Sequence, residues 1–148
     1  MSKLGNKRTA FKIQRSLLCE LPGLGKPGAL ERRAYPPGQH GQLRRKFSEY
    51  GLRLREKQKL MFHYGLREEQ LRRFVTRAKY GKNADWMSSL IGALETRIDN
   101  VVFRLGFAPS IAAARQLVRH GKVLVNGKRL DIGSAQILPG DVVSLTLD

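Results

Sequence analysis

Positive charge is concentrated in the first sixty residues of this chain. The sequence of 148 residues carries 28 Lys and Arg against 12 Asp and Glu, a formal net charge of +16. Residues 1–60 hold +11 of that excess, residues 61–92 hold +3 and residues 93–148 hold +2. A folded surface of this charge density repels itself unless a polyanion covers it. The chain is therefore expected to fold against a fixed anionic partner.

The remaining composition indicates a folded protein and excludes several other classes. Apolar residues, counting Gly and leaving out Tyr, make up roughly half of the chain, too many for a wholly disordered basic tail. No run approaches the roughly 20 apolar residues that cross a bilayer, and residues 1–26 lack the apolar core of a secretion signal. Cys19 is the only cysteine and the histidines are scattered, so we expect no disulfide, no metal site and no cofactor.

Residues 21–47 are predicted to form an extended loop. Four of the six prolines and five glycines lie between Leu21 and Gly41, which disfavours regular structure. Loops of this length are uncommon in compact domains unless they are functional or disordered. The segment carries basic and aromatic side chains and ends in Arg44-Arg45-Lys46, so it is suited to follow a line of phosphates. The alternative is a basic leader without defined contacts.

A helix is predicted after Ser48, which is a plausible N-cap. Tyr50, Leu54, Met61 and Tyr64 recur on one face of that helix, so we expect them to be core residues.

Like charges lie one turn apart on the rest of this helix, in the pairs Arg53/Lys57 and Arg55/Lys59. Each such pair costs roughly 0.2–0.5 kcal/mol, which a negative partner would relieve. A second helix over about residues 67–80 places Glu before Arg at the favourable spacing, so we expect it to pack on protein more than on a polyanion. Its predicted apolar stripe is Leu71, Phe74, Val75 and Ala78.

The last third of the chain predicts a compact module of two helices and a small antiparallel sheet. One helix runs from Leu94 towards a C-capping Gly106, and a second begins after Ser110. Asn126-Gly127 between two β-prone runs is a strong hairpin signal, and a further strand follows over residues 142–147. Asp99 is expected to form a surface ion pair. The predicted core consists of Ile98, Val101, Leu105, Ile111, Leu117, Val118, Val123, Leu130, Val143 and Leu145.

Several stretches of this module resemble the RNA-binding domain named after ribosomal protein S4. They are LETRIDNVVFRLGFA at 94–108, ARQLVRHG at 114–121, Val125-Asn126-Gly127 and Pro139-Gly140-Asp141. Two earlier stretches, ERRAYPPGQHG at 31–41 and YGLRLREKQKL at 50–60, are typical of the bacterial and organellar ribosomal protein S4 family itself. The similarity covers about residues 31–147.

This resemblance implies an α+β protein with a basic helical region, residues 1–93, followed by an S4-type domain, residues 94–148. Its implied function is to bind small-subunit rRNA directly and help nucleate assembly of the 5′ domain of the bacterial or organellar small subunit. The implied partners are neighbouring small-subunit proteins and messenger RNA near its path into the ribosome, with no membrane partner. The residues to which we assign rRNA contact are Arg32, Arg33, Tyr35, Gln39, His40, Arg44, Arg45, Tyr50, Arg53, Arg55, Lys57, Lys59, Arg97, Ser110, Arg115, Gln116, Arg119, His120, Lys122, Asn126, Lys128 and Arg129.

The chain departs from the family pattern in two respects. It lacks the N-terminal cysteine cluster through which some members bind zinc, and it stops at Asp148 where members usually continue. A fragment, a reduced organellar or symbiont form, and a shortened paralogue remain open.

Other functions are weighed against this interpretation. No Ser-His-Asp order, paired carboxylates or phosphate-binding glycine loop indicates an enzyme. A free RNA-binding regulator is the main alternative. For Arg115 and Arg119 the alternative to RNA contact is a solvated helix face.

Overall fold

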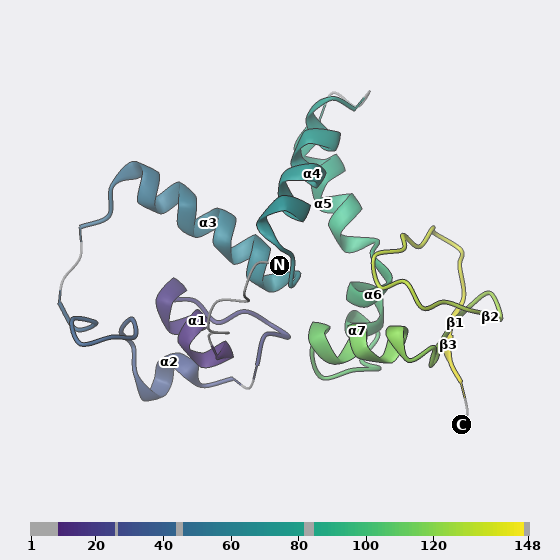
Figure 1. Cartoon of the computed structure of the whole chain (residues 1–148), viewed down its shortest axis with the longest axis horizontal. Coiled ribbons are helices and arrows are strands. Elements are labelled where there is room, and N and C mark those ends of the chain that lie inside the picture. Colours follow the sequence, from purple (N-terminus) through teal and green to yellow (C-terminus); the bar gives the residue numbers. More distant parts are fainter. Residues whose placement is uncertain (1–8, 26, 44–45, 82–84, 147–148) are drawn as a thin grey trace, which may run out of the picture. The chain divides into compact units, whose positions relative to one another are not determined.

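The computed structural model describes residues 9–25, 27–43, 46–81 and 85–146. The chain divides into two compact units, Met1–His63 and Tyr64–Asp148 (Figure 1). Arg44, Arg45 and Leu147, which the sequence analysis assigned to RNA contact or to a strand, lie outside the described residues. The α+β class is confirmed, because helices and one antiparallel sheet occur together.

The N-terminal unit consists of α1 (Ala10–Leu17), α2 (Ala29–Arg32) and α3 (Glu49–His63). Helix α1 packs against both of the others and buries Ile13, Gln14 and Leu17. Helix α3 begins directly after Ser48 as predicted, and the Ser48 hydroxyl caps it by accepting the Gly51 N–H at 3.1 Å. It buries no residue of its own. The core role predicted for Tyr50 is wrong: this side chain is 74% exposed, because the contact with α1 leaves most of α3 uncovered.

The segment predicted to be an extended loop contains the short helix α2. The Glu20 carboxylate accepts the backbone N–H groups of Gly28 at 3.0 Å and Leu30 at 3.2 Å. These two bonds satisfy donors at the start of α2, where a helix has no partners of its own. The prediction is therefore corrected at residues 29–32, while the rest of the described segment from 21 to 47 is irregular.

The C-terminal unit begins with two helices that lie side by side, α4 (Glu68–Lys79) and α5 (Trp86–Glu95) (Figure 1). Helices α6 (Ile98–Arg104) and α7 (Ile111–Arg119) then pack closely on each other. Between α6, α7 and the sheet lies a core of fully buried side chains. Its buried members are Ile98, Val102, Ala108, Ala114, Val118 and Val123.

Glycine ends both helices of this module. Gly106 has φ +79°, and the N–H groups of Gly106 and Phe107 bond the carbonyls of Phe103 and Val102 at 3.0 and 3.2 Å. That pattern is a Schellman motif, which favours glycine because L side chains rarely adopt positive φ. Gly121 ends α7 in the same way. Leu105, predicted as core, is 52% exposed because it is the C-cap of α6 and turns away from the core.

The sheet has the order β2-β1-β3, with β1 (Val123–Val125) at its centre. Strands β2 (Lys128–Arg129) and β3 (Val143–Leu145) both pair with β1 in antiparallel register. The Asn126-Gly127 turn forms as predicted, with φ of +51° and +76°, and pairs Val125 with Lys128. Leu145 is 37% exposed, because it lies on an edge strand and not in the core predicted for it.

The compact units meet between His63 and Tyr64, and the division into a helical region and an S4-type domain at residues 93 and 94 stays a prediction. Tyr64, α4 and α5 belong to the second unit together with the sheet-containing module. The physical reason is that side chains of α6 and α7 hold residues just before and within this helical pair, as described below. Independent folding of residues 94–148 remains a prediction.

Candidate nucleic-acid interface

The basic loop of the N-terminal unit is held in place by α1. Arg15 donates from Nε to the carbonyl of Tyr35 at 3.0 Å and from Nη2 to that of Pro36 at 3.4 Å. Its guanidinium also lies 5.1 Å from the centre of the Tyr35 ring. The loop is therefore anchored at its middle. The predicted contact residues around this anchor are exposed, except for the half-buried Tyr35, and they are Arg32, Arg33, Gln39 and His40.

Helix α3 supplies partners for some of its own positive charge. Arg53 pairs with Glu49 and Lys59 pairs with Glu56, while the Arg55 guanidinium lies 3.9 Å from the centre of the Phe47 ring. The like charges are thus relieved in part within the chain, and not by an external partner alone as expected. Exposed ion pairs of this kind contribute little, so a phosphate can replace the carboxylate at small cost.

In the C-terminal unit, the end of α7 and strand β2 form one basic surface. Arg129 of β2 donates from Nε to the carbonyl of Gly121, just beyond α7, at 2.8 Å. That bond brings the hairpin to the helix end, where Arg119 and His120 are exposed. We call this surface the α7–β2 surface. Its exposed members are Gln116, Arg119, His120 and Arg129, and Lys128 is also exposed at the neighbouring position of β2.

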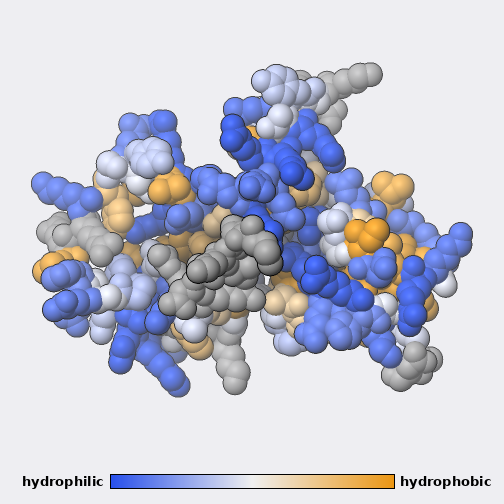
Figure 2. All heavy atoms as spheres, in the orientation of Figure 1, coloured by the Kyte–Doolittle hydropathy of each residue, from blue (hydrophilic) through white to orange (hydrophobic). Residues whose placement is uncertain are grey.

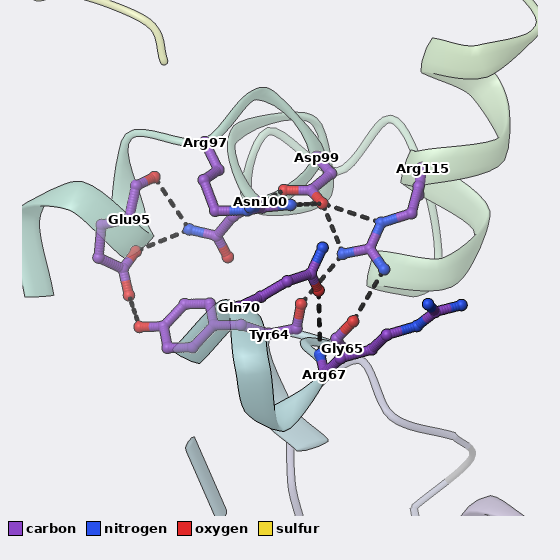
Figure 3. A network of polar contacts seen from close by, with 9 residues as sticks. All are labelled: Tyr64, Gly65, Arg67, Gln70, Glu95, Arg97, Asp99, Asn100 and Arg115. Carbon is purple, nitrogen blue, oxygen red and sulfur yellow. Dashed lines mark hydrogen bonds and ion pairs between the residues drawn. The ribbon is translucent and has the colours of Figure 1, made fainter. Parts of the chain in front are cut away.

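Two other predicted contact residues lie in a buried ion-pair cluster (Figure 3). Arg97 donates to the two carboxylate oxygens of Asp99 at 3.0 and 2.7 Å, and Arg115 donates to Asp99 Oδ2 from Nε at 3.0 Å and Nη2 at 2.6 Å. Side-chain exposure is 1% for Asp99, 5% for Arg97 and 30% for Arg115. The surface ion pair predicted for Asp99 is therefore wrong.

The segment after β2 buries this cluster. Backbone N–H groups of Ile98 and Asp99 bond the carbonyls of Ala135 at 2.8 Å and Gly133 at 3.4 Å. Apolar periodicity contains no signal for this covering segment, because it has no regular structure. The only sequence hint was the alternation of opposite charges at Arg97 and Asp99 within an apolar run.

Arg115 connects the S4-type module to the chain in front of α4. It donates to the carbonyl of Gly65 from Nη1 at 2.9 Å and to that of Tyr64 from Nη2 at 3.1 Å (Figure 3). Together with the bonds to Asp99, these contacts occupy the guanidinium inside the protein. Arg97 and Arg115 thus hold parts of this unit together and Arg119 is exposed, while RNA contact by each of the three stays a prediction.

Glu95 forms a second polar centre next to this cluster. Tyr64 Oη donates to its Oε1 at 2.6 Å, Arg104 Nη2 to the same oxygen at 2.6 Å, and Asn100 Nδ2 to Oε2 at 2.9 Å. Burial alone would raise the pKa of Glu95, but these hydrogen bonds outweigh burial and hold it below its usual range. Burial and the hydrogen bond to Glu95 raise the pKa of Tyr64.

Ser110 and Asn126 also use their side chains inside the module. The Ser110 hydroxyl accepts the Ala113 N–H at 3.1 Å and so caps α7. Asn126 donates from Nδ2 to Asp141 at 2.8 Å, and its Oδ1 accepts the Val142 N–H at 2.9 Å. This clamp joins the hairpin turn to the start of β3. Hydrogen bonds from Leu138 N–H and Asn126 lower the pKa of Asp141. Lys122 is half-buried and its carbonyl accepts from Thr146.

Two family models match consecutive parts of the chain. Residues 5–95 match the ribosomal protein S4/S9 N-terminal domain, and residues 96–143 match the S4 domain. The chain belongs to the ribosomal protein S4 family. The two matched domains meet between Glu95 and Thr96, inside the second compact unit.

Curated relatives in the S4 family include small ribosomal subunit protein uS4B of Bdellovibrio bacteriovorus, 66% identical over 139 residues that cover 94% of this chain and 67% of that protein. Protein uS4 of Synechococcus elongatus is 56% identical over 86% of this chain and 62% of its own length. Protein uS4 of Acaryochloris marina is 56% identical over 85% and 61%. The chain thus spans about two thirds or less of these relatives.

Within the described residues of this S4 family member, no helix is long and apolar enough to span a membrane. In the same residues, no group of three or more His, Cys, Asp or Glu side chains could hold a metal ion.

Sequence reasoning missed three exposed arginines of α4, which are Arg72, Arg73 and Arg77. Arg72 and Arg73 were expected to be balanced by Glu68 and Glu69, which lie one turn before them. Arg72 and Arg73 form no ion pair with the described acidic residues. Their surplus of positive over negative charge along the helix was the signal that could have found them.

Proposed function

We propose that this protein is a structural constituent of the small ribosomal subunit that binds small-subunit rRNA directly and helps nucleate its assembly. The observation that carries this proposal is the pair of basic surfaces, one in each compact unit, in a chain of the ribosomal protein S4 family. Both surfaces are fixed by arginine bonds to backbone carbonyls, Arg15 to Tyr35 and Arg129 to Gly121. They therefore offer pre-positioned cations to an RNA that is already folded.

Recognition operates through phosphates and shape. A-form RNA hides most base edges in a deep and narrow groove, and the candidate contacts are chiefly Arg and Lys, which bind phosphate oxygens. The contacting set on the described residues is the exposed loop around Tyr35, the basic side of α3 and the α7–β2 surface. Arg97 and Arg115 support the α7–β2 surface by holding α6, α7 and the segment before α4 together. No catalytic step enters this function.

The proposed location is a bacterial ribosome, as in the named relatives, or an organellar one. Neighbouring small-subunit proteins are the expected protein partners, and messenger RNA near its path into the ribosome is a further one.

Co-sedimentation tests this function against a free regulator carrying the same domain. The tagged full chain is expressed in a bacterium, and small subunits are isolated through a high-salt wash. A structural constituent stays with the subunits in an amount close to one copy each, because many phosphate contacts must break together. Complete loss in the wash, with binding to free RNA retained, would favour the regulator.

A further inference from the structure

Helix α4 exposes a face of arginines that the two basic surfaces do not include. Arg72, Arg73 and Arg77 are exposed, and Arg73 and Arg77 lie one turn apart on the same side. Within the described residues none of these three side chains takes part in an ion pair. Figure 2 shows hydrophilic side chains covering the region of α4. This face therefore presents more positive than negative charge, with Glu69 as its acidic side chain.

A groove runs along this face. Helix α4 lines it with Gln70, Arg73, Phe74 and Arg77. Arg97 and Ser134 complete the lining, and the volume of the groove is about 280 Å³. All of these residues belong to the second compact unit. The groove is thus built by three segments that are separate in sequence, which are α4, the start of α6 at Arg97 and the segment that buries Asp99.

The chemistry of the lining selects an anion. Guanidinium, amide and hydroxyl groups line the groove and no carboxylate does. Arginine binds phosphate oxygens through two parallel N–H bonds, which suits it to this role better than lysine. Within the groove, the Arg97 guanidinium lies 5.9 Å from the centre of the Phe74 ring, so these two lining side chains form a cation–π pair. On its outer side the arginine face continues over Arg72 and Thr76, where Glu69 is the only acidic lining residue.

We propose that this groove, the α4 groove, binds a backbone phosphate of RNA and forms a third contact surface of the protein. The inference rests on the proposed function, because it assigns the phosphate to the RNA that the chain binds. A polymer is favoured over free phosphate since the positive face extends beyond the groove to Arg72, which one phosphate could not cover. Helix α4 packs on α5 and buries Leu71 and Ala78, so the proposal adds an RNA contact on its exposed side.

The test compares two doubly neutralised full-length chains. R73Q/R77Q removes the two arginines that α4 contributes to the groove, and K12Q/R67Q removes two exposed charges outside the groove and outside the contact set. The probe is the 5′ domain of small-subunit rRNA transcribed in vitro, titrated at several salt concentrations. Each lost phosphate contact flattens the slope of log affinity against log salt by about 0.7–0.9. R73Q/R77Q removes the contact with that one phosphate, so its slope should be flatter by about 0.7–0.9, and the slope of K12Q/R67Q should change much less.

Hydroxyl-radical footprinting of the same complexes gives a second readout. R73Q/R77Q should lose one patch of backbone protection and keep the others, which a general loss of stability would not produce. R73K/R77K retains the charge and should keep that patch. The melting temperature of the free R73Q/R77Q chain should equal that of the unmodified chain. If it falls, footprints of R73K/R77K and of the single variant R73Q are compared at the same patch of backbone protection.

The outcomes separate the two proposals. Equal salt slopes and footprints for R73Q/R77Q and K12Q/R67Q would overturn the α4 groove, and loss of a neighbouring protein from reconstituted particles with RNA contacts intact would assign it to a protein instead. Saturation by inorganic phosphate alone, abolished in R73Q/R77Q, would assign it to a free anion. Failure of the unmodified chain to bind the rRNA would overturn the proposed function itself.

Discussion

The ion pairs of helix α3 in the first compact unit are exposed, whereas those at Asp99 in the second unit are buried. In the N-terminal unit, Met1–His63, Arg53 and Lys59 of α3 pair with exposed glutamates of the same helix, and α3 buries no residue. In the C-terminal unit, Tyr64–Asp148, Arg97 and Arg115 converge on a carboxylate that is 1% exposed.

The difference separates stability from recognition. A buried pair whose partner is removed leaves a charge in a poorly solvated site, whereas an exposed pair exchanges with solvent or with a phosphate. The exposed positive charge of α3 is thus available to RNA, whereas Arg97 and Arg115 of the second unit hold the fold together. We expect the C-terminal unit to fold alone and the N-terminal unit to depend more on its RNA.

Replacing Asp99 should give the largest effect on stability. D99N leaves the Arg97 guanidinium buried without a counter-charge, and loss of one partner of a buried pair typically costs about 3–5 kcal/mol. Urea unfolding of the full chain measures the loss. The matched control is E49Q, which removes the exposed partner of Arg53 and should leave the unfolding midpoint unchanged. Equal midpoints for D99N and the unmodified chain would end the contrast between the units.

Cutting the chain at two places should show which segment completes the C-terminal unit. A fragment of residues 64–148 keeps the Arg115 bonds to Tyr64 and Gly65, and a fragment of residues 94–148 loses them. Hydrogen bonds to charged groups are each worth about 1.5–3 kcal/mol, so the shorter fragment should be less stable by at least that amount. Thermal unfolding followed by circular dichroism compares them. A shorter fragment of equal stability would support the predicted boundary at residues 93 and 94.

Arg115 and Arg119 lie one turn apart on α7 and bring the comparison down to two side chains. R115Q should lower the stability of the free protein by about 1.5–3 kcal/mol, because it removes hydrogen bonds to Asp99 and two carbonyls. R119Q should leave stability unchanged and flatten the salt slope of RNA binding by about 0.7–0.9. Melting curves and salt titrations of both variants provide the measurement. The reverse pattern would show that Arg119 is the structural residue.

The pH dependence of the second unit should show a small contribution from Glu95. Its pKa is lower in the folded than in the unfolded protein, so its stabilising contribution is present above the unfolded pKa of about 4.3 and is lost as pH falls through the folded pKa. E95Q should flatten the decline of stability with acid in that range. The check is unfolding of the 64–148 fragment between neutral and acid pH. An unchanged pH profile in E95Q would remove Glu95 from the stabilising set.

Much of the second module was predictable because its signals are local. Gly106 and Gly121 end their helices, and Asn126-Gly127 makes the hairpin, all from backbone preferences that act within a few residues. Tyr50 and Leu105 were misassigned because periodicity shows which residues share a face and not whether another element covers that face. Helix α2 was missed because its N-terminus depends on Glu20, outside the helix.

The candidate site was predictable as a set of residue types but not as a geometry. The resemblance and the charge pattern pointed to Arg119, Lys128 and Arg129, of which the structure brings Arg129 to the end of α7 next to Arg119. They could not separate Arg115 from Arg119, because that distinction depends on the irregular segment from Asp131 to Gln136 and on residues 64 and 65. RNA contact by each assigned residue remains a prediction.

Arg15 has a consequence for how mutational data on this protein would be interpreted. It lies in α1, yet its bonds hold the backbone at Tyr35 and Pro36, twenty and twenty-one positions further along. Changing it would release the loop whose exposed side chains are proposed to meet RNA. A scan scored only on ribosome incorporation would rank Arg15 beside Arg32 and Arg33 although its guanidinium is turned inward, and only a separate measurement of the loop in the free protein would tell the anchor from the ligands.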